Sequence, residues 1–443
     1  MIALGDNTFK HPDSFVDKEI DYNIFNLIKD NDDMLTEGCT YHRFINGICA
    51  VYEIVADTDY EYITIGCSQS TFIMVAIGAM LSGKTAVHDY YDRDGKKVYH
   101  IGYIHVSENY KETMNKIVKR INNKELGGMI FSTSGSTGEA RDVYLSWYNI
   151  MAAIHAFRND PTIDYSGFDS VLHCVPNNHV YGFLMELLFI ILGARAKYAT
   201  SSNIYYDYLD FKPKVLPVVP AILNKFYEKS LPLNLNLLIC AGAPLRLDVA
   251  EFYGKTCRQI LKGYGTTESA ACLTLSTDPK DDGICTAANV IRIADDGELL
   301  VKGLSISDSV IGTDGWYHTN DIVSVGSDNR LRIIGRKNNT IKLQQGEFIN
   351  LDELSILYTT NSIDTVVYAN PLYRYPRAIV YIDDTVNRED IPKIFKDIHE
   401  RNNRKGFERI QTITIRSIKD MPLINGVKPD YKNIREEAIA LHV

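Results

Sequence analysis

The sequence has 443 residues, which is too long for one compact core, so two or three domains are expected. Hydrophobic residues make up 45% of it and charged residues 23%, which is typical of a globular protein. The net charge is -9, and there is no long basic stretch. Because neutralising phosphates requires clustered Lys and Arg, the composition argues against a nucleic-acid binder.

Cysteine spacing and apolar runs bear on the cellular compartment. No cysteine belongs to a CxxC pair or stands at zinc-finger spacing to a histidine, so small buried thiols in a reducing cytosol are expected. The N-terminus lacks a signal-peptide pattern, and the most apolar run, residues 183–192, is too short to span a bilayer. We therefore expect a cytoplasmic protein without membrane insertion. The eight cysteines are Cys39, Cys49, Cys67, Cys174, Cys240, Cys257, Cys272 and Cys285.

Short β-branched runs alternate with helical patterns in the part of the chain before about residue 200. This alternation is typical of βα units around a parallel sheet. The predicted strands are residues 62–66, 85–88 and 129–132, and the predicted helices are residues 68–81, 149–157 and 183–192.

The pattern changes to short strands and turns after about residue 285. Two strand pairs are expected, one of residues 290–293 with 298–301 and one of residues 322–325 with 331–334. The segment from Arg336 onward has the size and pattern of a small α+β domain. The predicted fold class is therefore α/β: a large N-terminal domain of parallel βα units with a β-rich subdomain, followed by a small C-terminal domain.

The segment 131–143, FSTSGSTGEARDV, follows a predicted strand and is rich in Gly, Ser and Thr. Glycines let backbone N–H groups approach phosphate oxygens, and hydroxyls add further donors. Arg141 can add a fixed positive charge. On its own, the segment fits a flexible linker equally well.

A second glycine motif competes with this loop. Residues 78–85, GAMLSGKT, fit the pattern GxxxxGK[ST]. A working phosphate loop of that type needs a strand before it and a helix after it. Here the predicted order is reversed, because a helix precedes the motif and a strand follows it. We therefore interpret the match as accidental.

Six further segments decide between these loops. Together with 131–143 they resemble, in the same order, the motifs of the adenylate-forming superfamily, which comprises acyl-CoA synthetases, aryl-acid ligases, adenylation domains of peptide synthetases and luciferases. The resemblance runs from about Thr40 to the end of the chain. The segments are PNNHVYG at 176–182, AGAP at 241–244, GYGTTE at 263–268, GWYHTND at 315–321, GRKNNTIK at 335–342 and MPLINGVKPD at 421–430. The departures from the family pattern are Ala140, Arg141, Asn320, Gln345 and Val427.

The resemblance implies an AMP-forming acid–thiol ligase. Such an enzyme would use ATP and Mg²⁺ to convert a carboxylic acid into an acyl-adenylate with release of pyrophosphate, and would then transfer the acyl group to a thiol. Residues 1–335 would form the large domain that holds the ATP and acid sites. Residues 336–443 would form a small, mobile domain that carries the catalytic lysine.

The resemblance also implies a set of ATP-binding residues. The loop would hold the β- and γ-phosphates with support from Arg141, Tyr264 would pack against adenine, and Asp321 would bind the ribose with Arg336 beside it. An ordinary core tyrosine and an ordinary turn aspartate are the alternatives for two of these residues. The full set is Thr133, Ser134, Gly135, Ser136, Thr137, Gly138, Arg141, Gly242, Ala243, Pro244, Tyr264, Gly265, Asp321 and Arg336.

Three residues are implied to be catalytic. Thr267 would donate to the α-phosphate, and Glu268 would bind Mg²⁺ as a hard oxygen ligand. Lys428 would bridge the carboxylate and the α-phosphate oxygens. Outside these motifs, Glu268 and Lys428 would be interpreted as solvated surface residues. Asn338 stands where the family has its hinge, about which the small domain would rotate.

The acid pocket is implied to include His179, Val180 and Gly182, although such residues could equally be core. Peptide-synthetase domains place an aspartate at the position of Val180 to pair with an amino group. Because burying an unpaired ammonium is costly, a fatty or aryl acid is favoured over an α-amino acid. The acceptor would be coenzyme A or the phosphopantetheine of a carrier protein, and the short large domain slightly favours the carrier.

Two alternatives from other classes stay open. One is a catalytically impaired relative that only binds nucleotide or acyl ligands, which the five departures allow. The other is a phosphotransferase built on residues 78–85.

Overall fold

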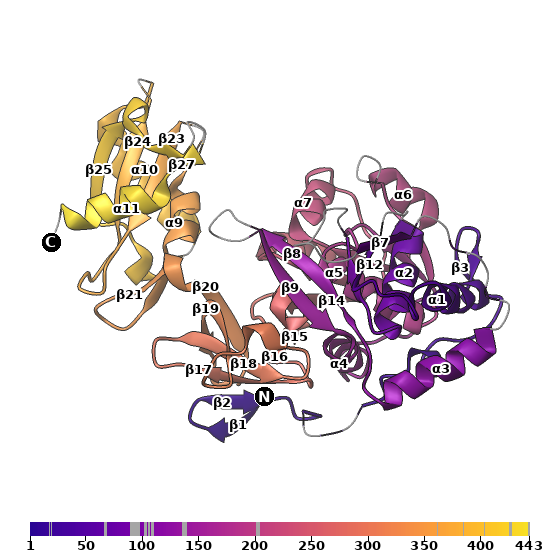
Figure 1. Cartoon of the computed structure of the whole chain (residues 1–443). Coiled ribbons are helices and arrows are strands. Elements are labelled where there is room, and N and C mark those ends of the chain that lie inside the picture. The colour runs from indigo at the N-terminus through magenta and orange to yellow at the C-terminus, as the bar shows by residue number, and fades with distance from the viewer. Residues whose placement is uncertain are drawn as a thin grey trace. The chain divides into compact units, whose positions relative to one another are not determined.

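The computed structural model describes the chain except for residues 17, 19, 66–68, 89–97, 102–103, 105–106, 108–109, 135–139, 201–203, 361, 384, 403, 425–427 and 442–443, and except for the side chains of residues 69, 70, 100, 134, 140, 424, 428 and 429. The chain divides into two compact units (Figure 1). The first unit is Met1–Ala294, Leu300–Thr319 and Val325–Arg332, and the second is Asp295–Leu299, Asn320–Ser324 and Ile333–Val443.

The first unit begins with a five-stranded sheet of order β7-β5-β6-β8-β9. Strand β5 is parallel to β6 and β7, β6 is parallel to β8, and β9 is antiparallel to β8. The predicted strands and helices of this region are confirmed with small shifts, apart from residues 66 and 68 at the ends of two of them, which lie outside the described residues. The strands are β5 (Tyr62–Ile65), β6 (Thr85–Val87), β7 (Val98–Ile101), β8 (Gly128–Ser134) and β9 (Ala140–Ser146), and the helices are α1 (Tyr41–Val55), α2 (Gln69–Leu81), α3 (Tyr110–Asn122) and α4 (Trp147–Arg158).

A seven-stranded sheet of order β11-β10-β12-β13-β14-β15-β16 follows. The strands from β11 to β14 are mutually parallel, while β15 and β16 are antiparallel additions. This arrangement of parallel strands and helices confirms the predicted α/β class. The strands are β10 (Ser170–His173), β11 (Arg195–Tyr198), β12 (Val215–Val218), β13 (Leu237–Ala241), β14 (Gln259–Tyr264), β15 (Thr274–Ser276) and β16 (Ile284–Cys285), and the helices are α5 (Val180–Ile191), α6 (Ile204–Phe211), α7 (Pro220–Glu228) and α8 (Leu247–Tyr253).

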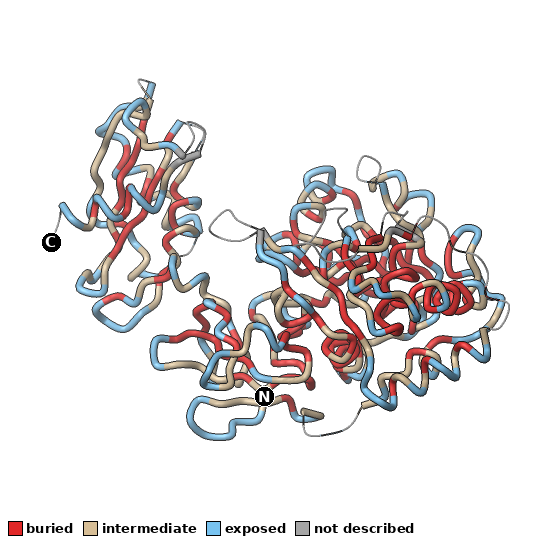
Figure 2. The backbone as a smooth tube through the Cα atoms, in the orientation of Figure 1, coloured by how far each residue is buried: buried red, intermediate tan, exposed pale blue. Residues whose placement is uncertain are grey.

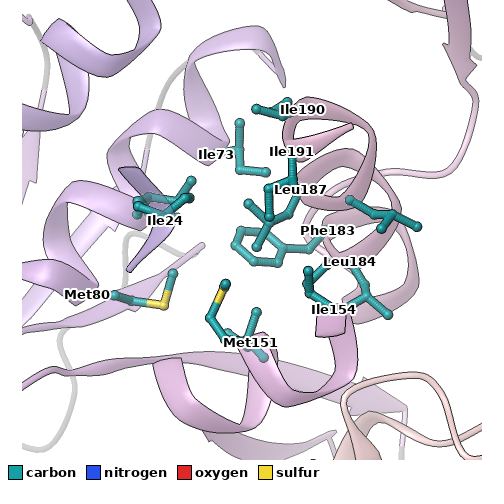
Figure 3. Close-up of a cluster of buried hydrophobic side chains, with 14 of the residues drawn as sticks. Ile24, Ile73, Met80, Met151, Ile154, Phe183, Leu184, Leu187, Ile190 and Ile191 are labelled. Atoms are coloured by element: carbon teal, nitrogen blue, oxygen red, sulfur yellow. The ribbon is translucent and has the colours of Figure 1, made fainter. Parts of the chain in front are cut away.

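Helix α5 forms the centre of the largest hydrophobic core. It is apolar on all sides except at Glu186, and its side chains pack against those of α2 and α4, as Figure 3 shows for Phe183, Leu187, Met80 and Met151. Burying each such side chain contributes about 1.5–3 kcal/mol. The predicted buried helix at 183–192 is therefore confirmed, and Figure 2 shows how buried stretches follow the strands and helices of each unit.

A six-stranded sheet of order β1-β2-β17-β18-β19-β20 holds both strand pairs predicted after residue 285. The boundary between the two units passes through β18, β19 and β20. The strands are β1 (Ile2–Gly5), β2 (Thr8–Lys10), β17 (Asn289–Ile293), β18 (Glu298–Gly303), β19 (Tyr317–Val325) and β20 (Leu331–Arg336), and a separate pair is formed by β3 (Met34–Thr36) and β4 (Cys39–Thr40).

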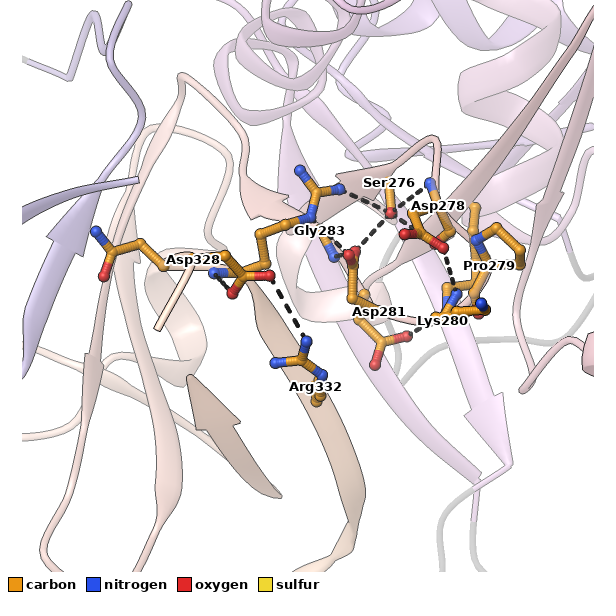
Figure 4. A network of polar contacts seen from close by, with 12 residues as sticks. Ser276, Asp278, Pro279, Lys280, Asp281, Gly283, Asp328 and Arg332 are labelled. Carbon is orange, nitrogen blue, oxygen red and sulfur yellow. Dashed lines mark hydrogen bonds and ion pairs between the residues drawn. The ribbon is translucent and has the colours of Figure 1, made fainter. Parts of the chain in front are cut away.

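An ion pair between the buried Asp281 and the partly exposed Arg330 ties the loop between β15 and β16 to the start of β20. Asp281 is 4% exposed, and its carboxylate receives hydrogen bonds from Ser276 Oγ at 2.6 Å and from Arg330 Nε at 2.6 Å. Figure 4 shows this network, in which the Gly283 N–H also donates to Asp281, at 2.8 Å. Burial raises the pKa of Asp281, but these hydrogen bonds outweigh burial and hold the pKa below its usual value.

The Asp281→Ala variant should be strongly destabilised. The buried carboxylate of Asp281 accepts hydrogen bonds from Ser276, Gly283 and Arg330, and losing a hydrogen bond to a charged group costs about 1.5–3 kcal/mol. The Arg330 side chain that stays behind is 29% exposed, so water compensates part of its charge. The control is Asp328→Ala, because Asp328 pairs with Arg332 at 3.6 Å and both side chains are nearly half exposed, so the expected loss is below about 1 kcal/mol. Thermal unfolding followed by circular dichroism measures the difference, and equal midpoints for the two variants would contradict the expectation.

The second unit contains a three-stranded sheet and two strand pairs. In the sheet, β23 is antiparallel and β25 is parallel to the central β24. Apolar side chains from both faces of this sheet are buried under α9, α10 and α11. The strands are β21 (Thr340–Lys342), β22 (Phe348–Asn350), β23 (Ile363–Tyr368), β24 (Arg377–Ile382), β25 (Thr412–Ser417), β26 (Leu423–Ile424) and β27 (Lys428–Pro429), and the helices are α9 (Leu351–Tyr358), α10 (Ile391–Arg401) and α11 (Tyr431–Ala440).

In neither unit do the described residues form a helix with the length and apolarity that crossing a membrane requires.

Candidate functional site

Several predicted site residues meet at one edge of the seven-stranded sheet. Because β10, β12, β13 and β14 are parallel, the segments that follow their last residues leave the sheet at the same edge, where ligands bind in open α/β sheets. Ala241 lies opposite Gly263, so Gly242, which follows β13, lies beside Tyr264, the last residue of β14. Gly242 has a φ of +89°, which glycine adopts without strain, and Ala243 and Pro244 are exposed beside it.

The turn after β14 holds Thr267 and Glu268 on a short 3-10 helix, η2 (Thr267–Ser269). Thr266 and the buried Ser269 cap this helix reciprocally, since the Thr266 N–H donates to Ser269 Oγ at 3.0 Å. The Thr266 hydroxyl also lies 3.2 Å from the buried Tyr317 hydroxyl. The turn is therefore fixed from both sides, and it presents the half-buried side chains of Thr267 and Glu268.

Ser307 connects this turn to the hairpin of β8 and β9. Its N–H donates to the Glu268 carbonyl at 2.8 Å, and its hydroxyl donates to the Tyr144 carbonyl of β9 at 2.6 Å. Ser307 is fully buried, so neither bond is exposed to competition from water. Sequence reasoning missed this residue, because it lies 39 and 163 positions from its two partners and belongs to no motif.

The β8–β9 hairpin carries the ends of the predicted phosphate loop. Thr133 lies opposite Arg141, and its hydroxyl donates to the Arg141 carbonyl at 3.2 Å. Arg141 is exposed. Ser134 ends β8, while the predicted residues Gly135, Ser136, Thr137 and Gly138 lie outside the described residues.

The predicted acid-binding segment lies at the start of α5. His179 precedes the helix and is exposed, whereas Val180 is buried. Gly182 packs so closely that an added Cβ would lie 2.1 Å from the Pro176 carbonyl oxygen, so no larger residue fits there without a shift. Phe183, next in the chain, packs edge-on against Phe131 of β8, with 5.7 Å between the centres of the two rings. This contact places the segment next to the strand that leads to Thr133.

The competing motif at residues 78–85 has the geometry of a helix end. Gly78 lies inside α2, where an added Cβ would lie 2.6 Å from the Val51 Cβ of α1. Gly83 has a φ of +82° after the last turn of α2, and Lys84 donates to the Thr58 carbonyl at 2.7 Å before β6 begins. These glycines therefore serve helix packing and helix termination, and the order of strand and helix that a phosphate loop requires is absent here.

The remaining predicted residues belong to the second unit. Asp321 is buried, and its carboxylate lies 3.2 Å from Nε of Arg336, whose side chain is 62% exposed. Asn320, which stands where the family has glycine, has a φ of +57°. Asn tolerates this left-handed conformation better than most residues, which explains how it replaces glycine.

Asn338 lies in the 3-10 helix η4 (Lys337–Asn339) between two anchored neighbours. Lys337 Nζ lies 2.6 Å from Asp296 and 2.8 Å from the buried Glu298, and Asn339 donates to Asp352. Asn338 itself is exposed. Lys428 begins β27, which pairs with β26, and its side chain is not among the described ones.

The residues at the sheet edge fit a magnesium nucleotide. Mg²⁺ is usually held by one or two carboxylates together with phosphate oxygens. The half-buried Glu268 can supply one such carboxylate, and Arg141 is an exposed cation on the β8–β9 hairpin.

Comparison with known proteins names the family. Residues 76–307, just over half of the chain, match the family described as AMP-binding enzyme. The chain belongs to this family. The matched region includes the β8–β9 hairpin, the start of α5 and the turn that carries Thr267 and Glu268. The predicted resemblance to adenylate-forming enzymes is confirmed.

Curated relatives of this chain include acyl-CoA ligases. Long-chain-fatty-acid–CoA ligase 1 of Saccharomyces cerevisiae is 24% identical over 403 residues, covering 72% of this chain and 56% of that protein. Long chain acyl-CoA synthetase 1 of Arabidopsis thaliana is 28% identical over 255 residues, covering 46% of this chain and 38% of that protein. The chain spans about half the length of the curated relatives it matches.

Solved structures share the fold. O-succinylbenzoate coenzyme A synthetase of Bacillus subtilis in complex with AMP has a TM-score of 0.66 at 14% identity, covering 93% of this chain and 97% of that one. The same enzyme in complex with ATP and magnesium ion has a TM-score of 0.64 at 15% identity, covering 91% and 96%. The predicted architecture of an adenylate-forming fold is thus confirmed, with one large and one small domain.

Proposed function

We propose that the chain is an AMP-forming acid–thiol ligase that uses ATP as a substrate. A carboxylate oxygen attacks the α-phosphorus, the bond to the pyrophosphate oxygen breaks, and acyl-AMP and pyrophosphate result. A thiol then attacks the acyl carbon and releases AMP. One observation carries this proposal: in the first unit, the phosphate hairpin, the acid segment and the Thr267–Glu268 turn are held together through Phe131, Phe183 and Ser307.

In the first unit, the proposed roles follow from charge and position. Thr133 to Gly138 hold the β- and γ-phosphates, and Arg141 offsets their charge. Glu268 binds Mg²⁺, which neutralises developing phosphate charge, and Thr267 donates to the α-phosphate. Gly242 to Pro244, Tyr264 and Gly265 form the adenine side.

In the second unit, Asp321 accepts hydrogen bonds from the ribose with Arg336 beside it. Lys428 bridges the carboxylate and α-phosphate oxygens and so offsets the repulsion between two anions. We also propose residues 1–335 and 336–443 as the two functional domains, with Asn338 as the pivot. Its anchored neighbours Lys337 and Asn339 support this assignment, because a hinge needs only a few residues that absorb a change in φ and ψ.

The proposed acid is fatty or aryl. The buried Val180 offers no partner for an ammonium group, and burying that charge unpaired would be costly. The long-chain-fatty-acid–CoA ligases among the relatives support a fatty acid and coenzyme A. A phosphopantetheinyl carrier protein stays as the second acceptor. Near the family's thiol channel, Gln345 replaces glycine, and its amide donates to the Arg374 carbonyl at 2.7 Å.

A cytoplasmic location without nucleic-acid partners completes the proposal. The described cysteines are free, which fits a reducing compartment, and the net charge of -9 disfavours binding to phosphate backbones.

Acid-dependent ATP–pyrophosphate exchange tests the proposed activation step. The test panel is octanoate, dodecanoate, hexadecanoate, benzoate and cinnamate. At least one of these acids should support exchange when Mg²⁺ is present, and no acid should support exchange when Mg²⁺ is left out. Adding coenzyme A or a phosphopantetheinyl carrier protein to the active mixture should yield a thioester detectable by mass spectrometry. If no acid supports exchange, the chain is a nucleotide- or acyl-binding relative and the proposal is wrong.

A further inference from the structure

A polar cluster interrupts the apolar core directly behind the acid-binding segment. Glu186 lies in the middle of α5 and is 1% exposed. Its carboxylate receives a hydrogen bond from the Tyr198 hydroxyl of β11 at 2.6 Å and one from Nδ2 of the buried Asn177 at 3.1 Å. A buried carboxylate is costly unless hydrogen bonds compensate its charge, so Glu186 and its two partners form one coupled unit.

One partner, Asn177, belongs to the segment that carries the proposed acid site. It follows Pro176, whose carbonyl accepts from the His179 N–H at 3.2 Å. The same carbonyl is the atom against which Gly182 packs. Holding Asn177 therefore restrains the adjacent Pro176, whose carbonyl contacts the first turn of α5 at His179 and Gly182.

We propose that Glu186 is a positioning residue for the acid substrate, because its carboxylate holds Asn177, and with it the 176–182 segment, in the acid-binding orientation. This inference rests on the proposed function. Glu186 does not touch the reacting atoms. It acts through Asn177, so its loss should affect the acid and leave ATP binding unchanged.

The protonation state of Glu186 controls this role. The ionised carboxylate accepts from both Asn177 and Tyr198, which is the observed arrangement. A protonated carboxyl carries one O–H that needs a hydrogen-bond acceptor. Either the Asn177 amide rotates to present its oxygen, or the Tyr198 hydroxyl changes from donor to acceptor. Burial raises the pKa of Glu186 to about 7, although the hydrogen bonds from Tyr198 and Asn177 oppose this shift.

The other titratable groups of the cluster do not change charge near neutral pH. His173 of β10 stacks on the Tyr198 ring at 5.6 Å, and burial lowers its pKa to about 3. Burial raises the pKa of the Tyr198 hydroxyl. Tyr41 on α1 and Cys39 on β4 act electrostatically on Tyr198, and burial raises the pKa of each of them as well. The side chains of α2 and α4 that Figure 3 shows against α5 are apolar.

The test measures the KM for the acid and for ATP between pH 6 and pH 8.5, with the panel acid that supports exchange. Below the pKa of about 7, protonation should raise the acid KM of the wild type, whereas above it the KM should reach its lowest value. Glu186→Gln places an NH₂ donor opposite the donors of Asn177 and Tyr198, where the wild type has an acceptor. At high pH, its KM for the acid should be about tenfold higher than that of the wild type, and this KM should not depend on pH. The KM for ATP should stay unchanged. Glu251→Gln on the exposed face of α8 is the control.

Two further variants keep the test decisive if Glu186→Gln does not fold. Asn177→Ala should raise the acid KM at every pH and remove its pH dependence. Tyr198→Phe removes only one donor, so the pH dependence should persist with its midpoint moved upward. Two results would overturn this inference and leave the proposed function standing. One is a KM for the acid and a KM for ATP that change together, and the other is a pH dependence of the acid KM that survives in Glu186→Gln or Asn177→Ala. A wild type without exchange would overturn the proposed function as well.

Discussion

Replacing Lys428 by alanine should lower acid-dependent ATP–pyrophosphate exchange by about a hundredfold to a thousandfold, the usual effect of removing one preorganised electrostatic donor. The reaction brings a carboxylate toward a phosphate that carries negative charge, and a single ammonium that touches both offsets this repulsion most where the new bond forms. The loss should therefore appear in kcat, while the KM for ATP changes little.

Two lysine controls make this result specific. Lys432 lies on α11 in the same unit, and its side chain is 86% exposed, so Lys432→Ala should retain wild-type exchange. Lys84→Ala should also retain it, because the Lys84 ammonium binds the Thr58 carbonyl at the end of α2. If Lys84→Ala abolishes activity and Lys428→Ala does not, residues 78–85 form the working phosphate site after all.

Contiguous motifs were the part of the site that could be predicted from sequence. The turn at 263–268 could be recognised from sequence because its glycines, tyrosine, threonines and glutamate are consecutive and belong to one local structure. Helices and strands were predicted for a similar reason, since α2 and α5 are mostly apolar along their 13 and 12 residues. The predicted order of α2 before β6 also argued against residues 78–85 as the phosphate-binding loop.

The supports of the site could not be predicted, because they depend on contacts between distant positions. Ser307 joins Glu268 to Tyr144 without belonging to any motif. Glu186 interrupts an apolar run, and only the fold reveals that Asn177 and Tyr198 approach it from a loop and from β11. Similarly, the second unit includes residues 295–299 and 320–324, which a boundary chosen along the chain cannot capture.

Gly265→Ala should be as damaging as the loss of a catalytic side chain. A Cβ at this position would lie 2.2 Å from the Ala271 carbonyl oxygen and 2.7 Å from the Cys272 nitrogen, and these are backbone atoms that cannot rotate away. Ala270 and Ala271 already have φ values of +49° and +67°, so the turn has little freedom to relax. The turn must open, which would displace Thr267 and Glu268.

We expect exchange activity of Gly265→Ala to fall about a hundredfold or more, because a displacement of about 1 Å at a catalytic group costs that much. Gly263→Ala is the matched control, since Gly263 lies two residues earlier, inside β14, and its Cβ would approach the Ala241 Cβ at an ordinary 3.4 Å. Circular dichroism should show both variants folded, with Gly263→Ala active. Comparable activity in the two variants would mean that the rigidity of this turn does not position the catalytic residues.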